Sequence, residues 1–186
     1  MAKLEDLPRL IQSQDWATAE RVLRKAAQGK SASAEVFYNL AKVLEQVGKP
    51  EQRAAWLKRA VARRPDYALA WFELGRVALE DGESDAALNA YQKAWEGDPS
   101  DSDARRMVAR LSLRFGRWEA AERALQDDED TEAMMLRYRI AAEMGDATPA
   151  LRDELLQDAA TRPDALRTLT RVAKGSVSLR LPQLRT

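Results

Sequence analysis

Apolar residues recur at spacings of three and four along most of the chain, and this pattern predicts α-helices. A glycine breaks the helical pattern in the middle of each longer unit, and a proline closes the unit at Pro65 and Pro99. Alternation of apolar and polar residues, which is typical of strands, does not occur before residue 176. The pattern therefore predicts an all-α protein built from pairs of helices.

These helix pairs repeat along the chain with a period of 34 residues. Residues 34–67 align without a gap with residues 68–101, and residues 102–130 continue the same register. Residues 15–27 match the second half of the unit. The matched positions include Phe37 and Trp71, Leu40 and Leu74, Ala41 and Gly75, Gly48 and Gly82, and Pro65 and Pro99. The chain is thus expected to be an array of helix–turn–helix units.

Gly75 lies inside one of the predicted helices, where glycine costs about 1 kcal/mol relative to alanine. The matching positions of the neighbouring units hold Ala41 and Ala109, so a small residue recurs there. Small residues let the two helices of a unit cross closely, while larger side chains interdigitate around the contact. We therefore expect the helical cost of Gly75 to be offset by tertiary packing.

One unit fits the pattern W-x2-L-G … A-x3-aromatic … P through Trp71, Leu74, Gly75, Ala87, Tyr91 and Pro99. In this respect the chain resembles the tetratricopeptide repeat (TPR) family. The resemblance implies a right-handed superhelical solenoid of four to five hairpins with a C-terminal capping helix. Two positions depart from the pattern, because Ala78 replaces the usual tyrosine and Arg53 replaces a small residue. The helices around Arg53 are therefore expected to cross differently.

The expected solenoid covers residues 1–175, followed by a tail. Its fifth unit is degenerate, because Tyr138 stands where a small residue belongs, and the acidic run Asp127–Asp130 shortens the unit before it. A terminal helix then caps the array, as solenoids need. In the tail, disorder is favoured over an extended segment. The predicted boundaries are 1–33, 34–67, 68–101, 102–130 and 131–163 for the units, 164–175 for the cap and 176–186 for the tail.

Composition removes several classes of function. The 30 basic residues are balanced by 30 acidic ones, which argues against a nucleic-acid binder. The sequence contains no Cys and no His, so disulfides, thiolate or imidazole metal sites and His-dependent catalytic triads are excluded. Glycines are single and tied to helix ends, so no phosphate-binding loop is expected. We expect no enzyme activity, no catalytic residue, no metal and no cofactor, and we interpret Asp127–Asp130 as a solvated loop rather than a divalent-ion site.

Insertion into a membrane is not expected either. The segment MAKLEDLPRL at the N-terminus lacks the apolar core of a signal peptide. The longest apolar run, Tyr67–Phe72, has six residues and is far too short to cross a bilayer. These features predict a cytoplasmic protein, although a processed precursor would hide a lost segment.

Four of the five tryptophans have an expected place in the repeat. Trp71 stands at position 4, Trp16 and Trp118 at position 17, and Trp95 at position 28, which are packing positions. Trp56 stands at position 23 and is not explained by the repeat.

The resemblance also implies a binding groove, because the first helix of each unit lines the concave side in this family. Lys42, Arg76, Arg110 and Arg139 share position 9 of their units and would form a basic ladder. Apolar, aromatic and further basic groove positions are held by Tyr38, Phe72, Arg106, Leu79, Leu113 and Arg114. Such a groove suits an extended or helical peptide that carries carboxylates, and an ordinary charged surface is the alternative.

The sequence therefore predicts a scaffold or adaptor that binds a protein or peptide partner. Two alternatives stay open: a regulatory or targeting module of a larger enzyme such as a transferase, and a chaperone-like assembly factor for secretion or cytochrome maturation. Self-association through the tail or a terminal helix is also open. Binding of the chaperone C-terminal motif is not supported, because only the charge of Lys42 is comparable with the residues that such members of the family use.

Overall fold

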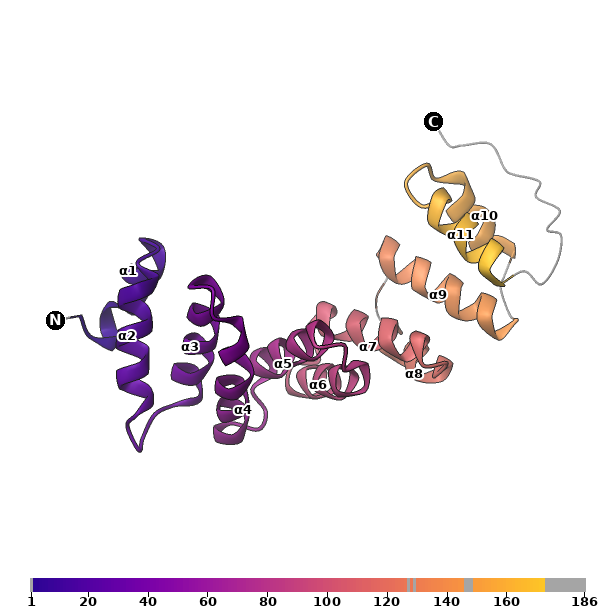
Figure 1. Cartoon of the computed structure of the whole chain (residues 1–186). Coiled ribbons are helices and arrows are strands. Elements are labelled where there is room, and N and C mark those ends of the chain that lie inside the picture. The colour runs from indigo at the N-terminus through magenta and orange to yellow at the C-terminus, as the bar shows by residue number, and fades with distance from the viewer. Residues whose placement is uncertain (1, 127, 129, 146–148, 173–186) are drawn as a thin grey trace. The chain divides into compact units, whose positions relative to one another are not determined.

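The computed structural model describes residues 2–126, 128, 130–145 and 149–172 (Figure 1). Every regular element in these ranges is a helix, which confirms the predicted all-α class. The chain divides into two compact units, Met1–Ala104 and Arg105–Thr186, called unit 1 and unit 2 here. The predicted tail, 176–186, lies outside the described residues.

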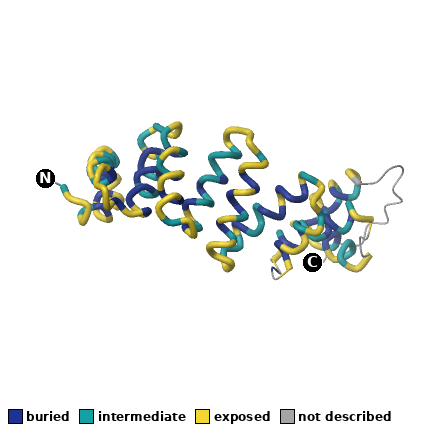
Figure 2. Tube along the Cα trace, turned by 90° about the horizontal axis from the view of Figure 1, so that it is seen from below, coloured by how far each residue is buried: buried dark blue, intermediate teal, exposed yellow. Residues whose placement is uncertain are grey.

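Unit 1 is a stack of helices that follow one another in chain order. Adjacent helices pack on each other, α1 on α2, α2 on α3, α3 on α4, α4 on α5 and α5 on α6. Their buried residues face these contacts (Figure 2). The helices are α1 (Leu7–Gln12), α2 (Trp16–Ala27), α3 (Ala34–Gln46), α4 (Arg53–Arg63), α5 (Ala68–Glu80) and α6 (Ser84–Gly97), with 3-10 turns η1 (Leu4–Asp6) and η2 (Pro50–Gln52).

The repeat is visible in where the helices begin and end. Helices α3 and α5 begin at Ala34 and Ala68, and α7 (Ser102–Arg114) begins after the same interval. Gly48 and Gly82 follow the ends of α3 and α5 with φ angles of 72° and 77°. This left-handed conformation favours glycine, because a Cβ atom would be strained there. The two glycines thus end the first helix of their repeats and let the chain turn back.

The close crossing expected at Gly75 is confirmed. A Cβ atom at Gly75 would lie 2.8 Å from Cζ of Tyr91, which is closer than real Cβ contacts allow. Tyr91 itself is 1 % exposed and meets Phe72 edge-on, with ring centroids 5.1 Å apart. Helices α5 and α6 therefore pack closely because Gly75 has no side chain, and the ring of Tyr91 fills the space that a side chain would take.

Burial of Tyr91 gives a pH dependence that can be measured. Burial raises the pKa of Tyr91 from 10.0 to about 12, because the phenolate is poorly solvated there. A pKa that is higher in the folded state stabilises the fold fully below pH 10, and the effect is lost as the pH rises toward 12. We expect the free energy of unfolding to fall over this range, and to fall less in Tyr91→Phe. Urea titrations of both proteins at several alkaline pH values measure this free energy. If Tyr91 were solvated, the free energy of unfolding would change with pH by the same amount in the two proteins.

Unit 2 contains the rest of α7 together with α8 (Trp118–Ala124), α9 (Thr131–Met144), α10 (Pro149–Gln157) and α11 (Arg162–Val172). Helix α11 packs on α9 and α10. Their shared core is formed by Tyr138, Leu155, Leu156 and Ala165. Tyr138, which departs from the repeat pattern, is fully buried there, so the degenerate unit uses a bulky ring in place of a close crossing.

The acidic run has structural partners where it is described. Helix α8 has 7 residues, against 14 in α6, and it ends just before this run. Asp128 and Asp130 both pair with Arg106 of α7. Asp130 also caps α9 by accepting a hydrogen bond from the backbone N–H of Ala133 at 2.9 Å. These two carboxylates therefore anchor the start of α9.

Candidate partner-binding surface

The predicted groove residues of unit 1 lie on its two first helices, α3 and α5. We call this set the first-helix surface: Tyr38, Lys42, Phe72, Arg76 and Leu79, all of them half-buried. Lys42 and Arg76 are brought together by the same two carboxylates, because both form ion pairs with Glu45 and Glu73. The shortest contact joins Nζ of Lys42 to Oε1 of Glu73 at 2.8 Å.

Arg53 joins the same group from α4. Its side chain is only 3 % exposed, and its guanidinium lies 3.3 Å from Glu73, 3.1 Å from Glu80 and 3.4 Å from Glu45. The result is a charge cluster of equal numbers of cations and carboxylates. Its members are Lys42, Arg53, Arg76, Glu45, Glu73 and Glu80.

The charge cluster favours the ionised forms of Glu45 and Lys42. Burial alone would raise the pKa of Glu45, but the hydrogen bond and charge of Lys42, together with the charges of Arg53 and Arg76, place this pKa below its usual value. Burial alone would lower the pKa of Lys42, and its hydrogen bond to Glu73 reverses the effect, so the pKa is raised. The predicted basic ladder is therefore internally neutralised within unit 1.

The aromatic residues of the first-helix surface are held by other rings. Tyr38 lies against Tyr67, with ring centroids 5.3 Å apart at an angle of 48°. Phe72 meets the buried ring of Tyr91. Both side chains are thus fixed in place and still half-exposed, which suits them to contact an apolar group of a partner at little further cost in side-chain entropy.

The predicted groove residues of unit 2 have mixed environments. Arg106 pairs with Asp128 and Asp130, and Arg110 pairs with Glu132. Arg110 and Arg139 line one hollow of the unit, while Arg114 is exposed at the end of α7. Leu113 is only 3 % exposed and packs inside the unit, so we leave it out of any partner-binding surface.

The acidic half of the charge cluster was missed by the sequence interpretation. Two signals could have located it: Arg53 stands where other units have alanine, and Glu73 interrupts an apolar stretch of its helix. A buried arginine requires carboxylates nearby, and the adjacent first helices supply them.

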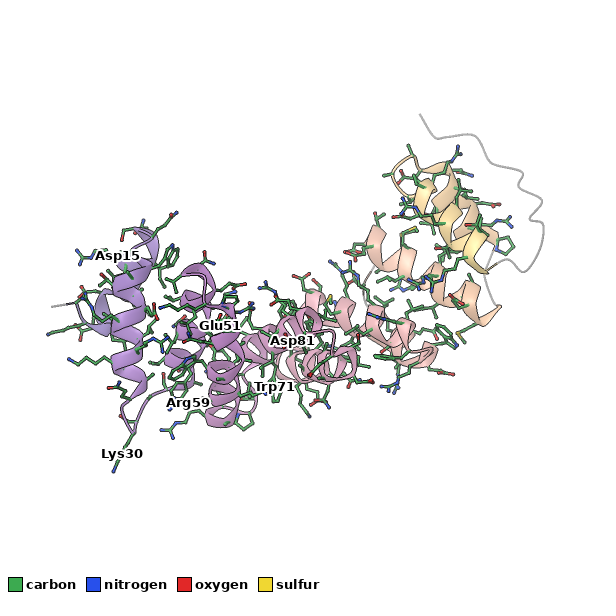
Figure 3. All side chains as sticks on the ribbon, in the orientation of Figure 1. Asp15, Lys30, Glu51, Arg59, Trp71 and Asp81 are labelled. Carbon is green, nitrogen blue, oxygen red and sulfur yellow. The ribbon has the colours of Figure 1, made fainter. Side chains whose placement is uncertain are left out.

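Two kinds of feature are absent from the described part of the chain, a cluster of metal ligands and a membrane-spanning helix. Within it, no group of three or more Asp, Glu, His or Cys residues is placed to hold a metal ion. No described helix combines the length and the apolar character that crossing a bilayer requires. The described elements are helices that follow one another as hairpins (Figure 3), which is the arrangement of a helical-repeat protein.

Sequence models of the tetratricopeptide repeat match residues 8–68, 38–101 and 78–137. The chain therefore belongs to the tetratricopeptide repeat family. Among characterised proteins it is similar to the small glutamine-rich tetratricopeptide repeat-containing protein 2 of Mycosarcoma maydis, with 29 % identity over 105 residues. That alignment covers 54 % of this chain and 30 % of the fungal protein, so the chain spans about a third of this relative's length.

Solved structures show the same fold. A tetratricopeptide repeat protein from Parabacteroides merdae matches with a TM-score of 0.70 and 17 % identity, over 91 % of this chain and 74 % of that protein. YrrB, described as a TPR protein with an unusual peptide-binding site, matches with a TM-score of 0.52 and 22 % identity, over 73 % and 69 % of the two chains. The predicted TPR solenoid is therefore confirmed as the fold.

Proposed function

We propose that this chain is a non-enzymatic scaffold that binds a segment of a partner protein on the first-helix surface of unit 1. The observation that carries the proposal is the charge cluster, which places basic and acidic side chains beside the partly exposed aromatic rings of Tyr38 and Phe72. The peptide-binding site ascribed to YrrB, which shares the fold, supports the same class of function.

The equal numbers of acidic and basic side chains in the charge cluster indicate which charges the partner segment should carry. Side-chain exposure is 34 % for Lys42, 39 % for Arg76 and 51 % for Glu80, so both signs reach solvent. A segment that carried only acidic residues would have to displace Glu45 and Glu73 from these cations. A segment with acidic and basic residues could pair with Lys42 and Glu80 at once. We therefore propose a partner segment of mixed charge with an apolar side chain for Tyr38 and Leu79.

The double variant Lys42→Gln/Arg76→Gln tests this proposal. We expect it to bind a captured partner about tenfold more weakly, because each lost charge-assisted hydrogen bond to a charged group contributes roughly 1.5–3 kcal/mol, of which rearrangement of the cluster returns a part. Neutral replacements are used because a glutamate at position 76 would add a further carboxylate to the cluster. Calorimetric titration of the partner into both proteins gives the affinities.

The matched control is Arg21→Gln/Lys25→Gln, which removes two exposed cations of α2 away from the first-helix surface. It should bind as the unchanged protein does. Equal affinity of both double variants, with melting preserved, would rule out the first-helix surface as the binding site.

A further inference from the structure

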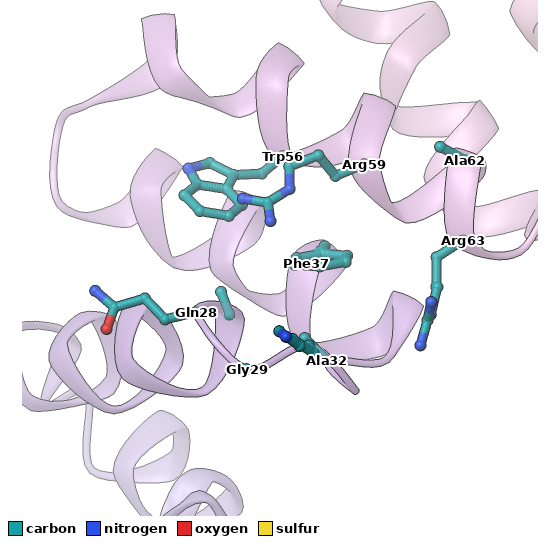
Figure 4. A pocket seen from close by; sticks show the side chains of 10 residues that line it. Gln28, Gly29, Ala32, Phe37, Trp56, Arg59, Ala62 and Arg63 are labelled. Carbon is teal, nitrogen blue, oxygen red and sulfur yellow. The ribbon is translucent and has the colours of Figure 1, made fainter.

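Unit 1 has a second feature on another side of its hairpins, a hollow of about 580 Å³ between the end of α2, the connection to α3, and α4 (Figure 4). Phe37 and Trp56 form its aromatic wall, with their rings stacked at a centroid distance of 6.0 Å and an angle of 25°. We call this hollow the α2–α4 pocket. Its volume lies within the roughly 300–1,000 Å³ typical of binding sites.

The guanidinium of Arg59 lies against both rings of this wall. Its central carbon is 4.5 Å from the centroid of Phe37 and 4.6 Å from that of Trp56 (Figure 4). Stacking uses the flat face of a guanidinium and leaves the N–H groups at its edge for other partners. Arg59 has no hydrogen bond or ion pair among the described residues. Its donor edge is thus oriented by the rings and available to an anion.

The pocket differs from the first-helix surface in its charge. Lys30 and Arg63 line it together with Arg59, and among the described residues that line it none is acidic. Figure 3 shows Lys30 at the tip of the loop that connects α2 to α3, and Arg59 on α4. Arg59 and Arg63 are four residues apart on one helix, where like charges repel. A bound anion would relieve this repulsion, whereas the charge cluster already contains its own carboxylates.

The repeat does not require this arrangement. The positions that match Trp56, Arg59 and Arg63 one unit later hold Ala90, Lys93 and Gly97. Trp56 is also the tryptophan that the packing positions of the repeat leave unexplained. The next repeat keeps a cation at Lys93 but lacks the counterparts of Trp56 and Arg63, so it has neither the second ring nor the second cation of the pocket.

We infer that the α2–α4 pocket binds an acidic peptide segment of a partner protein. A carboxylate would accept hydrogen bonds from the edge of Arg59, and an apolar neighbour in the peptide would lie on the partly exposed ring of Trp56, which the buried ring of Phe37 supports from behind. Nucleic acid fits less well, because tight binding to phosphates needs more cations than the pocket and the zero net charge provide. This inference goes beyond the first-helix surface and does not depend on it.

Fluorescence anisotropy with a short labelled peptide of alternating Asp and Leu tests the inference. We expect binding to weaken by about tenfold in Arg59→Gln, and by a smaller factor in Arg59→Lys, which keeps the charge and loses the planar fork. Arg63→Gln and Lys30→Gln should also weaken binding, and these side chains are exposed, so the test stands even if Arg59→Gln folds poorly. Binding should decrease as salt is added.

Three controls show whether the α2–α4 pocket itself binds the acidic peptide. Arg21→Gln, and Lys93→Gln at the exposed position that matches Arg59 one repeat later, should bind the peptide unchanged. A matched peptide of Asn and Leu should bind much more weakly. Equal binding of the two peptides, unchanged affinity in Arg63→Gln and Lys30→Gln, or displacement of the peptide by a single-stranded oligonucleotide at lower concentration than by the unlabelled peptide would each overturn the inference.

Discussion

Replacing Arg53 with alanine should lower the free energy of unfolding by about 3 kcal/mol, the lower end of the 3–5 kcal/mol that follows loss of one partner of a buried ion pair. Arg53 is buried and pairs with Glu45, Glu73 and Glu80. Removing it leaves Glu73, itself 7 % exposed, with fewer cations in a poorly solvated place. Lys42 and Arg76 still compensate in part, which places the effect at the lower end. Urea unfolding followed by circular dichroism measures the loss.

The double variant Arg53→Ala/Glu73→Ala separates lost packing from an unpaired charge. We expect it to be more stable than Arg53→Ala alone, because the carboxylate left unpaired is gone. The exposed Arg21 provides the matched single control, and Arg21→Ala should change stability by no more than about 0.5 kcal/mol. A loss below about 1 kcal/mol in Arg53→Ala would contradict the burial and pairing of this side chain.

Gly75→Ala should destabilise the protein by about 1–3 kcal/mol, although alanine is the better helix former. The new methyl group would overlap the ring of Tyr91, which lies within 3 Å of the Cβ position and is buried on all sides. The cost of moving this ring exceeds the roughly 1 kcal/mol gained in helix propensity. Thermal and urea unfolding of both proteins give the difference.

The neighbouring repeats of the chain indicate which second substitution should compensate for Gly75→Ala. Where Gly75 faces Tyr91, the preceding unit has Ala41 and Leu57, and the following unit has Ala109 and Leu125. We expect Tyr91→Leu to remove most of the harm of Gly75→Ala, so that the two substitutions are not additive. Strictly additive effects would show that the clash is not the cause.

The fold was predictable because its information is local and repeated. Gly75 pointed to a close helix crossing, and Gly48 and Gly82 to the ends of the first helices, through single residues at a fixed period. The short helix α8 likewise follows from the acidic run beside it. Each of these features depends on residues within one repeat, so the sequence alone was sufficient to predict it.

The electrostatics of the surface were not predictable in the same way. The sequence showed Lys42 and Arg76 at equivalent positions, but Glu73 meets Arg53 from 20 positions away, across a contact between two successive repeats. Which carboxylate reaches which cation depends on the packing of α4 against α5, and that packing is set by three-dimensional shape. The same limit applies to Trp56, which was unexplained in the sequence and lies in the wall of the α2–α4 pocket.

Site-specific photo-crosslinking in the native cell tests most directly whether the chain is a binding scaffold. A photo-crosslinking amino acid would replace Tyr38 or Leu79 of the first-helix surface in one set of proteins and Arg21, outside it, in another. We expect covalent adducts with another protein from the first-helix positions, reduced by Lys42→Gln/Arg76→Gln and absent from position 21. No adduct from positions 38 and 79, or equal adducts from position 21, would contradict the proposed function.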